Sequence, residues 1–255
     1  MNAPLKAWFE ADGRLLRLSL NRPKANLIDA AMIAALDGAL NEHLHKPGIC
    51  AILLDAEGPH FSFGASVDEH LPDKCADMLR SIHSLVLRLV ESPVPILVAA
   101  RGQCLGGGLE VALAGHLLFV AADATLGQPE MKLGVFAPAA SCLLPELIGP
   151  QRAFDLLLSG RNLTGTQAAN IGLAFEAAAD PTQAALAYFE AHLKPKSASS
   201  IRLAVKAARL DYAARVRSKI AAVENLYLTD LMNTHDAREG LEAFIAKRAA
   251  QWKHC

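Results

Sequence analysis

The segment Arg101-Gly102-Gln103-Cys104-Leu105-Gly106-Gly107-Gly108-Leu109-Glu110 lies between a predicted strand and a predicted helix. The apolar run at residues 96–100 has the length of a buried strand, and residues 109–114 have the composition of a short helix. Three consecutive glycines at the start of a helix leave backbone N–H groups uncovered, and such groups bind an anion or a developing oxyanion. Glycines also form tight turns with positive φ, so the glycine content by itself leaves both interpretations open.

Strand and helix patterns alternate on both sides of this segment. Alternating apolar and polar residues at 16–20 predict a half-buried strand, and continuous apolar runs predict strands at 49–54 and 117–121. Helical spacing follows Asp29, a plausible N-cap, and recurs at 78–90, 153–159 and 167–172. Residues 123–133 and the pair Ala137-Pro138 are predicted to be irregular. The alternation favours an α/β architecture.

The character of the sequence changes at Lys194-Pro195-Lys196-Ser197. From residue 200 to residue 253 the pattern is almost entirely helical. We therefore predict a boundary near Ser197, with residues 1–196 forming the core of the protein and residues 197–255 forming a C-terminal helical region.

Composition excludes several classes of protein. The chain has 255 residues, of which 52% are hydrophobic, enough for one large core. Twenty-five Lys and Arg against 26 Asp and Glu give no basic excess, which argues against a nucleic-acid partner. The five cysteines form no C-x-x-C pair and are expected to be reduced thiols. Neither a signal-peptide pattern at residues 1–8 nor a membrane-length apolar run is present, so a cytoplasmic location without membrane association is predicted.

Two glutamates are candidates for acid–base chemistry. Glu110 falls in the first turn of the helix after the glycines, and Glu130 falls in the extended segment Gly127-Gln128-Pro129-Glu130. Two carboxyl groups beside an oxyanion site can hold a water between them, one accepting its proton and the other donating a proton to carbon. The spacing does not show that they meet, and a single glutamate is most often a solvated surface residue.

Residues 61–69, Phe-Ser-Phe-Gly-Ala-Ser-Val-Asp-Glu, form a loop that offers a second backbone N–H beside the glycine segment. An ordinary strand-to-helix connection is the alternative interpretation. No G-x-S-x-G elbow, P-loop or dinucleotide fingerprint is present. His60, His70 and His116 lack metal-ligand spacing, and no metal site is predicted.

Six segments in order resemble the enoyl-CoA hydratase/isomerase (crotonase) superfamily. They are residues 21–26 (Asn-Arg-Pro-Lys-Ala-Asn), 61–69, 102–110, 127–134, 158–173 and 239–248. Together they span nearly the whole chain, which makes the resemblance far more specific than any single segment. It implies a crotonase-like spiral of β-β-α turns, an acyl-CoA-binding catalytic core, and a C-terminal helical region through which family members form trimers, commonly dimers of trimers.

The resemblance also implies roles for particular residues. The backbone N–H groups of Ala65 and Gly107 match those that bind the thioester oxygen in the family. Glu110 and Glu130 match the two glutamates of its hydratases, with the base and acid roles left open between them. The residues expected along coenzyme A are Lys24, Ala25, Phe63, Ala65 and Val67, with Phe244 and Lys247 reaching its adenine and phosphate end from a neighbouring subunit. No cofactor beyond the CoA part of the substrate is implied.

Two segments depart from the common family pattern. Residues 135–142 read Val-Phe-Ala-Pro-Ala-Ala-Ser-Cys where a glycine-rich stretch is usual, and Ser66 replaces an aspartate. With these departures, the chain resembles the family's hydratases of cyclohexa-1,5-diene-1-carbonyl-CoA in anaerobic benzoyl-CoA breakdown. That narrower resemblance implies 1,4-addition of water, giving 6-hydroxycyclohex-1-ene-1-carbonyl-CoA.

Other functions remain open at this point. Within the family, the alternatives are a straight-chain enoyl-CoA hydratase of β-oxidation and, less favoured, an isomerase or acyl-CoA hydrolase. From a different class, the chain is compatible with a non-catalytic acyl-CoA- or RNA-binding relative. The balanced charge and the presence of both Glu110 and Glu130 argue against that last interpretation.

Overall fold

Two sheets form the framework of the protein in the computed structural model, which describes residues 3–71 and 73–255. Met1, Asn2 and Pro72 lie outside the described residues, so the prediction for residues 1–8 is followed only from Ala3 onward. The larger sheet contains, in spatial order, β1 (Leu5–Glu10), β2 (Leu15–Leu20), β3 (Ala51–Ala56), β4 (Ile96–Ala100), β6 (Leu117–Ala121) and β9 (Glu176–Ala178). β1 pairs with β2 in antiparallel fashion, and the remaining neighbours are parallel.

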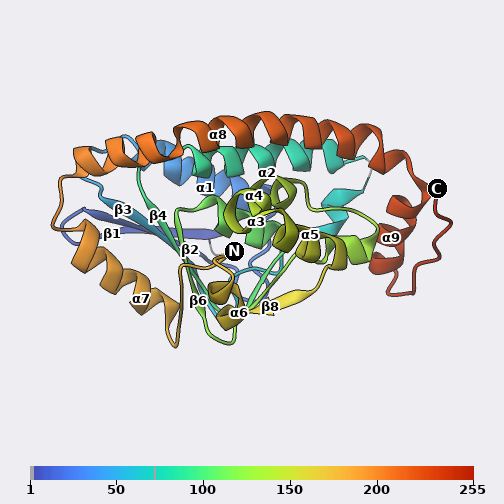
Figure 1. Ribbon diagram of the computed structural model, residues 1–255, viewed down its shortest axis with the longest axis horizontal. Coiled ribbons are helices and arrows are strands. Elements are labelled where there is room, and N and C mark those ends of the chain that lie inside the picture. The colour runs from blue at the N-terminus through green and yellow to red at the C-terminus, as the bar shows by residue number, and fades with distance from the viewer. Residues whose placement is uncertain (1–2, 72) are drawn as a thin grey trace.

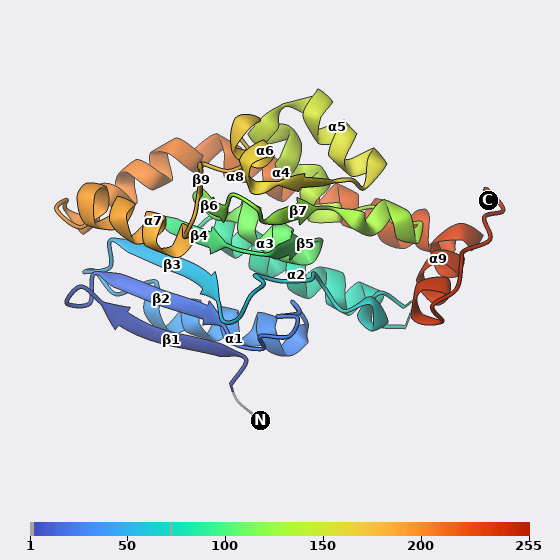
Figure 2. The same cartoon turned by 90° about the horizontal axis from the view of Figure 1, so that it is seen from below.

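A smaller sheet lies beside the first. The glycine segment and the segment that contains Glu130 follow two of its strands. Its strands are β5 (Gln103–Leu105), β7 (Thr125–Gly127) and β8 (Asn162–Thr164), with β5 and β7 parallel and β7 and β8 antiparallel. Figure 2 shows β5 and β7 close to α2 and α3, whereas β1, β2 and β3 form the opposite edge of the protein.

Helices cover the sheets. They are α1 (Ala30–His43), α2 (Cys75–Val90), α3 (Gly107–Ala114), α4 (Pro138–Ile148), α5 (Pro150–Ser159), α6 (Gly165–Asn170), α7 (Pro181–Tyr188), α8 (Ala198–Thr229) and α9 (His235–Ile245), with short helical turns η1 (Val67–His70), η2 (Pro129–Leu133), η3 (Phe189–Leu193) and η4 (Leu231–Asn233). In Figure 1 the long α8 runs along one side of the protein, and α9 folds back at the C-terminal end.

The chain repeats a β-β-α turn, as predicted. In the clearest turn, β4 of the large sheet leads to β5 of the small sheet and then to α3. The next turn leads from β6 to β7 and then, through η2, to α4. The turn before them follows β3 with an isolated bridge between Ser62 and Cys104 and then α2. In each turn a loop follows the segment that belongs to the small sheet. These loops lie together at one edge of that sheet.

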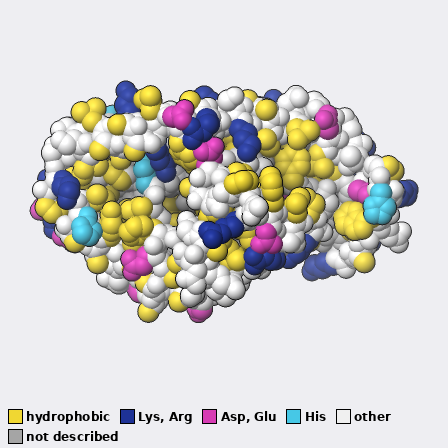
Figure 3. Space-filling model, viewed as in Figure 1, with side chains coloured by type: hydrophobic (Ala, Val, Ile, Leu, Met, Phe, Trp, Pro, Cys, Tyr) yellow, Lys and Arg dark blue, Asp and Glu magenta, His cyan; other side chains and the backbone are white. Residues whose placement is uncertain are grey.

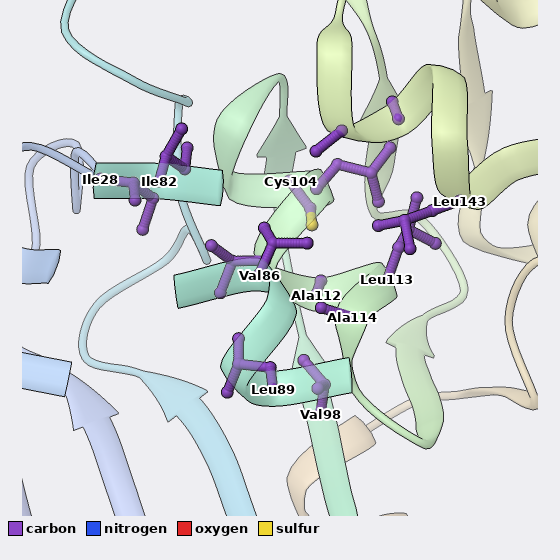
Figure 4. Close-up of a cluster of buried hydrophobic side chains, with 14 of the residues drawn as sticks. Ile28, Ile82, Val86, Leu89, Val98, Cys104, Ala112, Leu113, Ala114 and Leu143 are labelled. Atoms are coloured by element: carbon purple, nitrogen blue, oxygen red, sulfur yellow. The ribbon is translucent and has the colours of Figure 1, made fainter. Parts of the chain in front are cut away.

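The main core lies between the helices and the two sheets. Figure 4 shows Val86 of α2 close to Ala112 of α3 and Leu89 of α2 close to Val98 of β4, with Ile82 farther along α2. All five side chains are buried, with exposed fractions of 2% or less. Because α2 and α3 pack through small and branched apolar residues, the N-terminus of α3 is fixed relative to α2.

Helix α8 contributes to the same core. Its Val216, Ile220 and Tyr227 are buried in the main cluster. Arg209, also on α8, donates hydrogen bonds to the backbone oxygens of Val90 (3.0 Å) and Ala114 (3.1 Å) and to that of Gly115. These carbonyls lie at the C-terminal ends of α2 and α3, where the last turn of a helix leaves its acceptors unpaired. One cation thus ties three helices together.

Several sequence predictions are confirmed by the fold. The strands at 96–100 and 117–121 are β4 and β6, and Asp29 caps α1 by accepting a hydrogen bond from Met32 N at 2.9 Å. The helical pattern predicted after Ser197 is found in α8, which Ser197 caps by accepting a hydrogen bond from Ser200 N; the division of the chain into two regions there stays a prediction.

Other predictions of secondary structure were wrong. The strand at 16–20 was expected to be half-buried, but every residue of β2 is buried. Its Arg17 is tolerated inside because it pairs with Asp55 at 2.5 Å and with Glu10 at 3.0 Å. The pair Ala137-Pro138, expected to be irregular, begins α4, and the stretch 123–133 contains β7 and η2.

Within residues 3–71 and 73–255, no helix combines the length and apolar character that crossing a membrane requires.

Replacing Arg209 with methionine tests whether this side chain ties the helices together. The substitution keeps an unbranched apolar stem but leaves backbone oxygens at the ends of α2 and α3 without their charged donor. We expect the free energy of unfolding in urea to fall by about 3 kcal/mol. Arg217→Met on the same helix removes an exposed ion pair with Glu91 and should cost less than about 1 kcal/mol. Equal losses in the two variants would show that the buried contacts of Arg209 have no special role.

Candidate active site

A cavity of about 380 Å³ opens at the edge where the small-sheet loops gather. Its lining is mostly apolar, with a few polar groups, as is typical of a small-molecule site. The lining residues come from segment 63–70, α2, the glycine segment with α3, η2, residues 135–138 and α9. Glu110 and Glu130, which are twenty positions apart in the sequence, both line it.

Two backbone N–H groups meet at this cavity. A side-chain carbon placed on Gly107 would lie 3.2 Å from the backbone nitrogen of Ala65, so the two peptides are in contact. Gly107 is the first residue of α3, and its N–H therefore has no acceptor within the helix. Within the part of the chain that the structure describes, neither Ala65 N nor Gly107 N donates a hydrogen bond. The pair can bind one oxygen atom between them.

The glycines of these loops have a conformational role. Gly64 has φ +108° and Gly106 has φ +49°, in the region that other residues rarely adopt. The carbonyl of Gly64 accepts a hydrogen bond from Ile28 N, and Gly106 N donates one to the carbonyl of Gly127, both at 3.0 Å. The first bond fixes the peptide group that carries Ala65 N–H, and the second fixes the peptide group just before the one that carries Gly107 N–H. The tight turn and the oxyanion site, two interpretations left open by the sequence, are thus both features of this segment.

Glu110 is buried on α3 and contacts the beginning of α4. Its Oε1 accepts a hydrogen bond of 2.8 Å from Ala140 N, and α4 has no side-chain cap from its own N-cap residue, Ala137. The carboxylate therefore caps α4 from another helix, where the helix dipole favours negative charge. Burial raises the pKa of Glu110, whereas the backbone N–H groups of Ala139 and Ala140 and the charge of His83 oppose that rise.

Glu130 lies on η2, across from the glycine segment. A side-chain carbon on Gly106 would lie 2.7 Å from Glu130 Oε1, so Gly106 is required for the carboxyl group to approach. Burial first, and then the negative charge of Glu110, raise the pKa of Glu130 to about 8. Burial and the neighbouring charge therefore favour the protonated form of Glu130.

The side-chain amide of Gln128 adjoins Glu130. With its nitrogen turned toward the carboxyl group, Nε2 lies 3.1 Å from Oε1 and 3.2 Å from Oε2. The opposite orientation presents the amide oxygen instead. An amide can therefore donate to the ionised form of Glu130 or accept from the protonated form.

Most residues expected along coenzyme A lie at or beside the cavity. Phe63, Val67 and Phe244 line it, and Phe63 N donates to the carbonyl of Ala25 at 2.9 Å. Phe244 belongs to α9 of the same chain, and the contact from a neighbouring subunit stays a prediction.

Lys24 and Lys247 are exposed and do not line the cavity. Both are close in the sequence to residues that do contribute to it, but the structure brings neither side chain to the cavity.

Several lining residues were missed by the sequence analysis. Lys132 is a cation in the lining, whereas Phe136 and Pro138, which form the apolar wall, belong to the segment 135–142 that the sequence analysis had already singled out. His70 also lines the cavity; its Nδ1 is 2.8 Å from the backbone oxygen of Ser66, and burial lowers its pKa. Lys132 falls within segment 127–134, which resembles the family, and this position was the one indication in the sequence that it could belong to the site. Nothing in the spacing pointed to His70.

Clusters that could hold a metal ion were sought among the described residues, and no group of three or more His, Cys, Asp or Glu side chains was found. The polar groups of the cavity are instead two carboxyls, two backbone donors, one lysine and one histidine. This set can polarise a carbonyl and move protons.

Comparisons with known proteins agree with this geometry. The sequence model of the family "Enoyl-CoA hydratase/isomerase" matches residues 10–255. The chain is 62% identical to a cyclohexa-1,5-dienecarbonyl-CoA hydratase of Thauera aromatica, over 99% of this chain and 98% of the relative. It is 31% identical to a probable enoyl-CoA hydratase of Bacillus subtilis (strain 168), over 92% and 94% of the two chains.

A solved structure shares the fold. The enoyl-CoA hydratase/isomerase from Pseudoalteromonas atlantica T6c has a TM-score of 0.81 and 25% identity, with 98% of this chain and 99% of that chain covered. The chain belongs to the enoyl-CoA hydratase/isomerase family, and the predicted crotonase-like α/β fold is confirmed.

Replacing Gly106 with alanine tests the link between the loop conformation and the two carboxyl groups. The new methyl group would contact Glu130 and would require a strained backbone, so we expect turnover of an acyl-CoA substrate to fall at least about 100-fold. Gly48→Ala is the control, because nothing lies within 4 Å of its added carbon and its φ is ordinary. Turnover within about threefold of the unmodified protein in Gly106→Ala would contradict this placement of Glu130.

Proposed function

We propose that this chain is a hydratase, a carbon–oxygen lyase, that adds water to cyclohexa-1,5-diene-1-carbonyl-CoA in anaerobic aromatic degradation. The observation that carries the proposal is that two buried glutamates, Glu110 and Glu130, line one cavity beside two unpaired backbone N–H groups. The 62% identity to the Thauera aromatica hydratase over nearly the full length supports the cyclic substrate.

The reaction is written as a 1,4-addition. The water oxygen forms a bond to ring carbon 2, the electrons of the C1–C2 double bond pass to the thioester oxygen, and a dienolate results. A proton then adds to carbon 5, and the remaining double bond lies between carbons 1 and 6. Renumbering the ring gives 6-hydroxycyclohex-1-ene-1-carbonyl-CoA. The atoms of one water are consumed, and no electron acceptor is needed.

Ala65 N–H and Gly107 N–H are assigned to the thioester oxygen. The peptide group of Ala65 N–H and the peptide group before Gly107 N–H are each held by a hydrogen bond, so no reorganisation is needed when negative charge develops. A fixed donor in such a site is worth about 3 kcal/mol to the transition state. This is the largest contribution that the backbone makes to the proposed reaction.

Glu110 is assigned as the base and Glu130 as the acid. Glu110 has two backbone donors from the start of α4 that stabilise its ionised form, so it can take a proton from the attacking water. Glu130 has a pKa of about 8 and can give its proton to carbon 5. The active form of the pair therefore carries one proton, and the pair titrates as a unit.

The apolar wall supports a ring-shaped acyl group. Residues 135–138 replace the glycine-rich stretch of the common family pattern, and Phe136 packs edge-to-face against the buried Tyr227, with ring centroids 5.1 Å apart. A bulky, braced wall suits a flat six-membered ring better than a flexible chain. Coenzyme A is assigned to Lys24, Ala25, Phe63, Ala65 and Val67, with Phe244 and Lys247 of a neighbouring subunit at its adenine and phosphate end.

Self-association as a trimer or a dimer of trimers is part of the proposal. Figure 3 shows hydrophobic side chains exposed in several patches on one face, with charged side chains between them. Exposed apolar residues include Phe154 and Leu158 on α5 and Leu203 and Leu210 on α8. The division into a core (1–196) and an oligomerisation region (197–255), the cytoplasmic location, and the absence of a cofactor and of nucleic-acid or membrane partners belong to the same proposal.

A straight-chain enoyl-CoA hydratase is the second candidate. The observation that favours it is the 31% identity to the probable enoyl-CoA hydratase of Bacillus subtilis, together with a pair of carboxyl groups that any hydratase of this kind requires. The two functions differ in the substrate and share the mechanism, so a substrate comparison separates them.

Side-by-side assays on cyclohexa-1,5-diene-1-carbonyl-CoA and crotonyl-CoA test the proposed function. We expect kcat/KM to be at least about 100-fold higher for the cyclic diene, because its ring fits the wall at Phe136. Mass spectrometry in ¹⁸O-labelled water should show one labelled oxygen in the product. Phe136→Ala should lower the ratio of kcat/KM for the cyclic diene to that for crotonyl-CoA. Phe154→Ala, on the exposed face, should leave this ratio unchanged. Preference for crotonyl-CoA in the unmodified protein would replace the cyclic substrate with a straight-chain one.

The pH dependence of hydration tests the acid role of Glu130. The proton on this group is required, so kcat/KM should fall about tenfold per pH unit above pH 8. Glu130→Gln should reduce turnover by 100-fold or more. Lys132→Met is the control, because Lys132 is the other titratable group of η2. In this variant the fall in kcat/KM should begin at the same pH. If the fall began at a different pH in Lys132→Met, it would be assigned to the lysine and not to Glu130.

A further inference from the structure

Asn26 is a fully buried polar side chain to which the proposed reaction gives no role. Its exposed fraction is 0%, and its φ of +45° lies in the left-handed region, which asparagine tolerates better than most residues. Its Oδ1 accepts a hydrogen bond of 2.7 Å from Arg22 N, and its own N–H donates to Arg22 O at 2.8 Å. The side chain therefore closes the loop that follows β2.

The amide of Asn26 also joins this loop to the one that follows β3. Its Nδ2 donates hydrogen bonds to the backbone oxygens of Glu57 (3.1 Å) and His60 (3.0 Å). Both hydrogens of the amide, and its oxygen, thus have partners inside the protein. A buried side chain with three partners, held at a φ that most residues avoid, is a position that the surrounding structure determines closely.

The backbone on either side of Asn26 contacts the segment that carries an oxyanion donor. The carbonyl of Ala25 accepts a hydrogen bond from Phe63 N at 2.9 Å, and Ile28 N donates to the carbonyl of Gly64 at 3.0 Å. Because Asn26 lies between the two contacting residues, its left-handed conformation decides whether both of these bonds can form at once.

The bond from Ile28 fixes the direction of one donor. The carbonyl of Gly64 and the N–H of Ala65 belong to the same peptide group, in which the two point in opposite directions. With its carbonyl bonded to Ile28 N, this peptide group directs the N–H of Ala65 away from Ile28. Ala65 itself lines the cavity. The loop of Asn26 therefore determines how this donor meets a bound oxygen atom.

The same segment is bonded to β5, which leads to the other donor. Ser62 N donates to the carbonyl of Gln103 at 2.9 Å, and Ser62 O accepts a hydrogen bond from Leu105 N at 3.0 Å. β5 leads to Gly107, which supplies the second N–H. The spacing of the two donors therefore depends on how the segment of Ser62 is held by β5 and by the loop of Asn26.

We propose that Asn26 is a positioning residue that sets the direction and the spacing of the two oxyanion donors. This inference rests on the proposed function, in which these donors bind the thioester oxygen. A misdirected donor weakens most the state in which that oxygen carries negative charge. Loss of the Asn26 side chain should therefore lower kcat and leave KM nearly unchanged.

The test uses acetoacetyl-CoA, an acyl-CoA whose enolate absorbs in the near ultraviolet. Two aimed N–H donors favour the bound enolate, so the pKa of the bound ligand should lie below that of the free ligand. Asn26→Gly removes the side chain and tolerates the positive φ. In this variant we expect the pKa of the bound ligand to rise by about one unit, a tenfold weaker preference for the enolate. We also expect kcat for hydration to fall about tenfold, with KM within about twofold.

A control and a second variant accompany Asn26→Gly. Asn21→Gly removes another amide hydrogen bond in the same loop, to the carbonyl of Ala3 at 2.9 Å, and should leave both measurements unchanged. Asn26→Asp keeps the size of the side chain and the acceptor for Arg22 N. Its ionised carboxylate has no hydrogen to donate to the two backbone oxygens, so the pKa of the bound ligand should rise here as well.

The ligand titration separates the role of Asn26 from the proposed reaction. If the pKa of the bound ligand rises in Asn26→Gly although the unmodified protein hydrates no acyl-CoA, the positioning role stands and the proposed reaction fails. An unchanged pKa of the bound ligand in Asn26→Gly, with the fold confirmed by circular dichroism, would overturn the positioning role alone. Equal weakening of keto and enolate binding would mean that Asn26 is merely structural, which also overturns that role. If the unmodified protein does not lower the pKa of the ligand, both proposals fail.

Discussion

The hydrogen bond from Ala140 N to Glu110 joins the parts of the active site. It connects α3, whose first residue supplies one oxyanion donor, to α4, whose first turn follows the apolar wall. A buried carboxylate needs partners, and the N-terminus of a helix offers several donors at once. The helix in turn needs a cap, which its own N-cap residue, Ala137, does not provide. The carboxylate of Glu110 therefore caps α4, and the start of α4 supplies the hydrogen-bond donors that the buried carboxylate needs.

Two carboxyl groups in one apolar cavity cannot both be ionised without a large cost. Burial raises the pKa of each, and the charge of Glu110 adds to the effect on Glu130. The surroundings of the two groups differ, because the backbone donors at the start of α4 favour the ionised form of Glu110, whereas the charge of Glu110 favours the protonated form of Glu130. The proposed division into base and acid therefore depends on the neighbours of each carboxyl group and not on its own chemistry, which is the same.

The sequence predicted the elements whose signals are local. The cap at Asp29 and the apolar strands β4 and β6 depend on side chains within a few residues of one another, and they were found. The burial of β2 was missed because Arg17 is tolerated only by its pairing with Asp55, 38 residues away. The start of α4 was missed for a similar reason, since its cap is a glutamate on another helix.

The candidate site was likewise predicted only where its signals are local in the sequence. The glycine segment identified a place for an oxyanion from residues alone, but the partner N–H at Ala65 followed only from the family resemblance. The proximity of Glu110 and Glu130 depends on β5 and β7 being adjacent strands of the small sheet. Short three-residue strands have too little periodicity to be recognised in a sequence, so no argument from spacing could bring the two carboxyls together.

The departure at residues 135–142 affects substrate shape and proton transfer together. The segment supplies Phe136 and Pro138 to the wall of the cavity, and its next residues, Ala139 and Ala140, supply the backbone donors to Glu110. A change that reshapes the wall therefore also moves the groups that set the pKa of the base. Specificity for a ring and the ionisation of Glu110 cannot vary independently in this fold, because the same turn of α4 determines both.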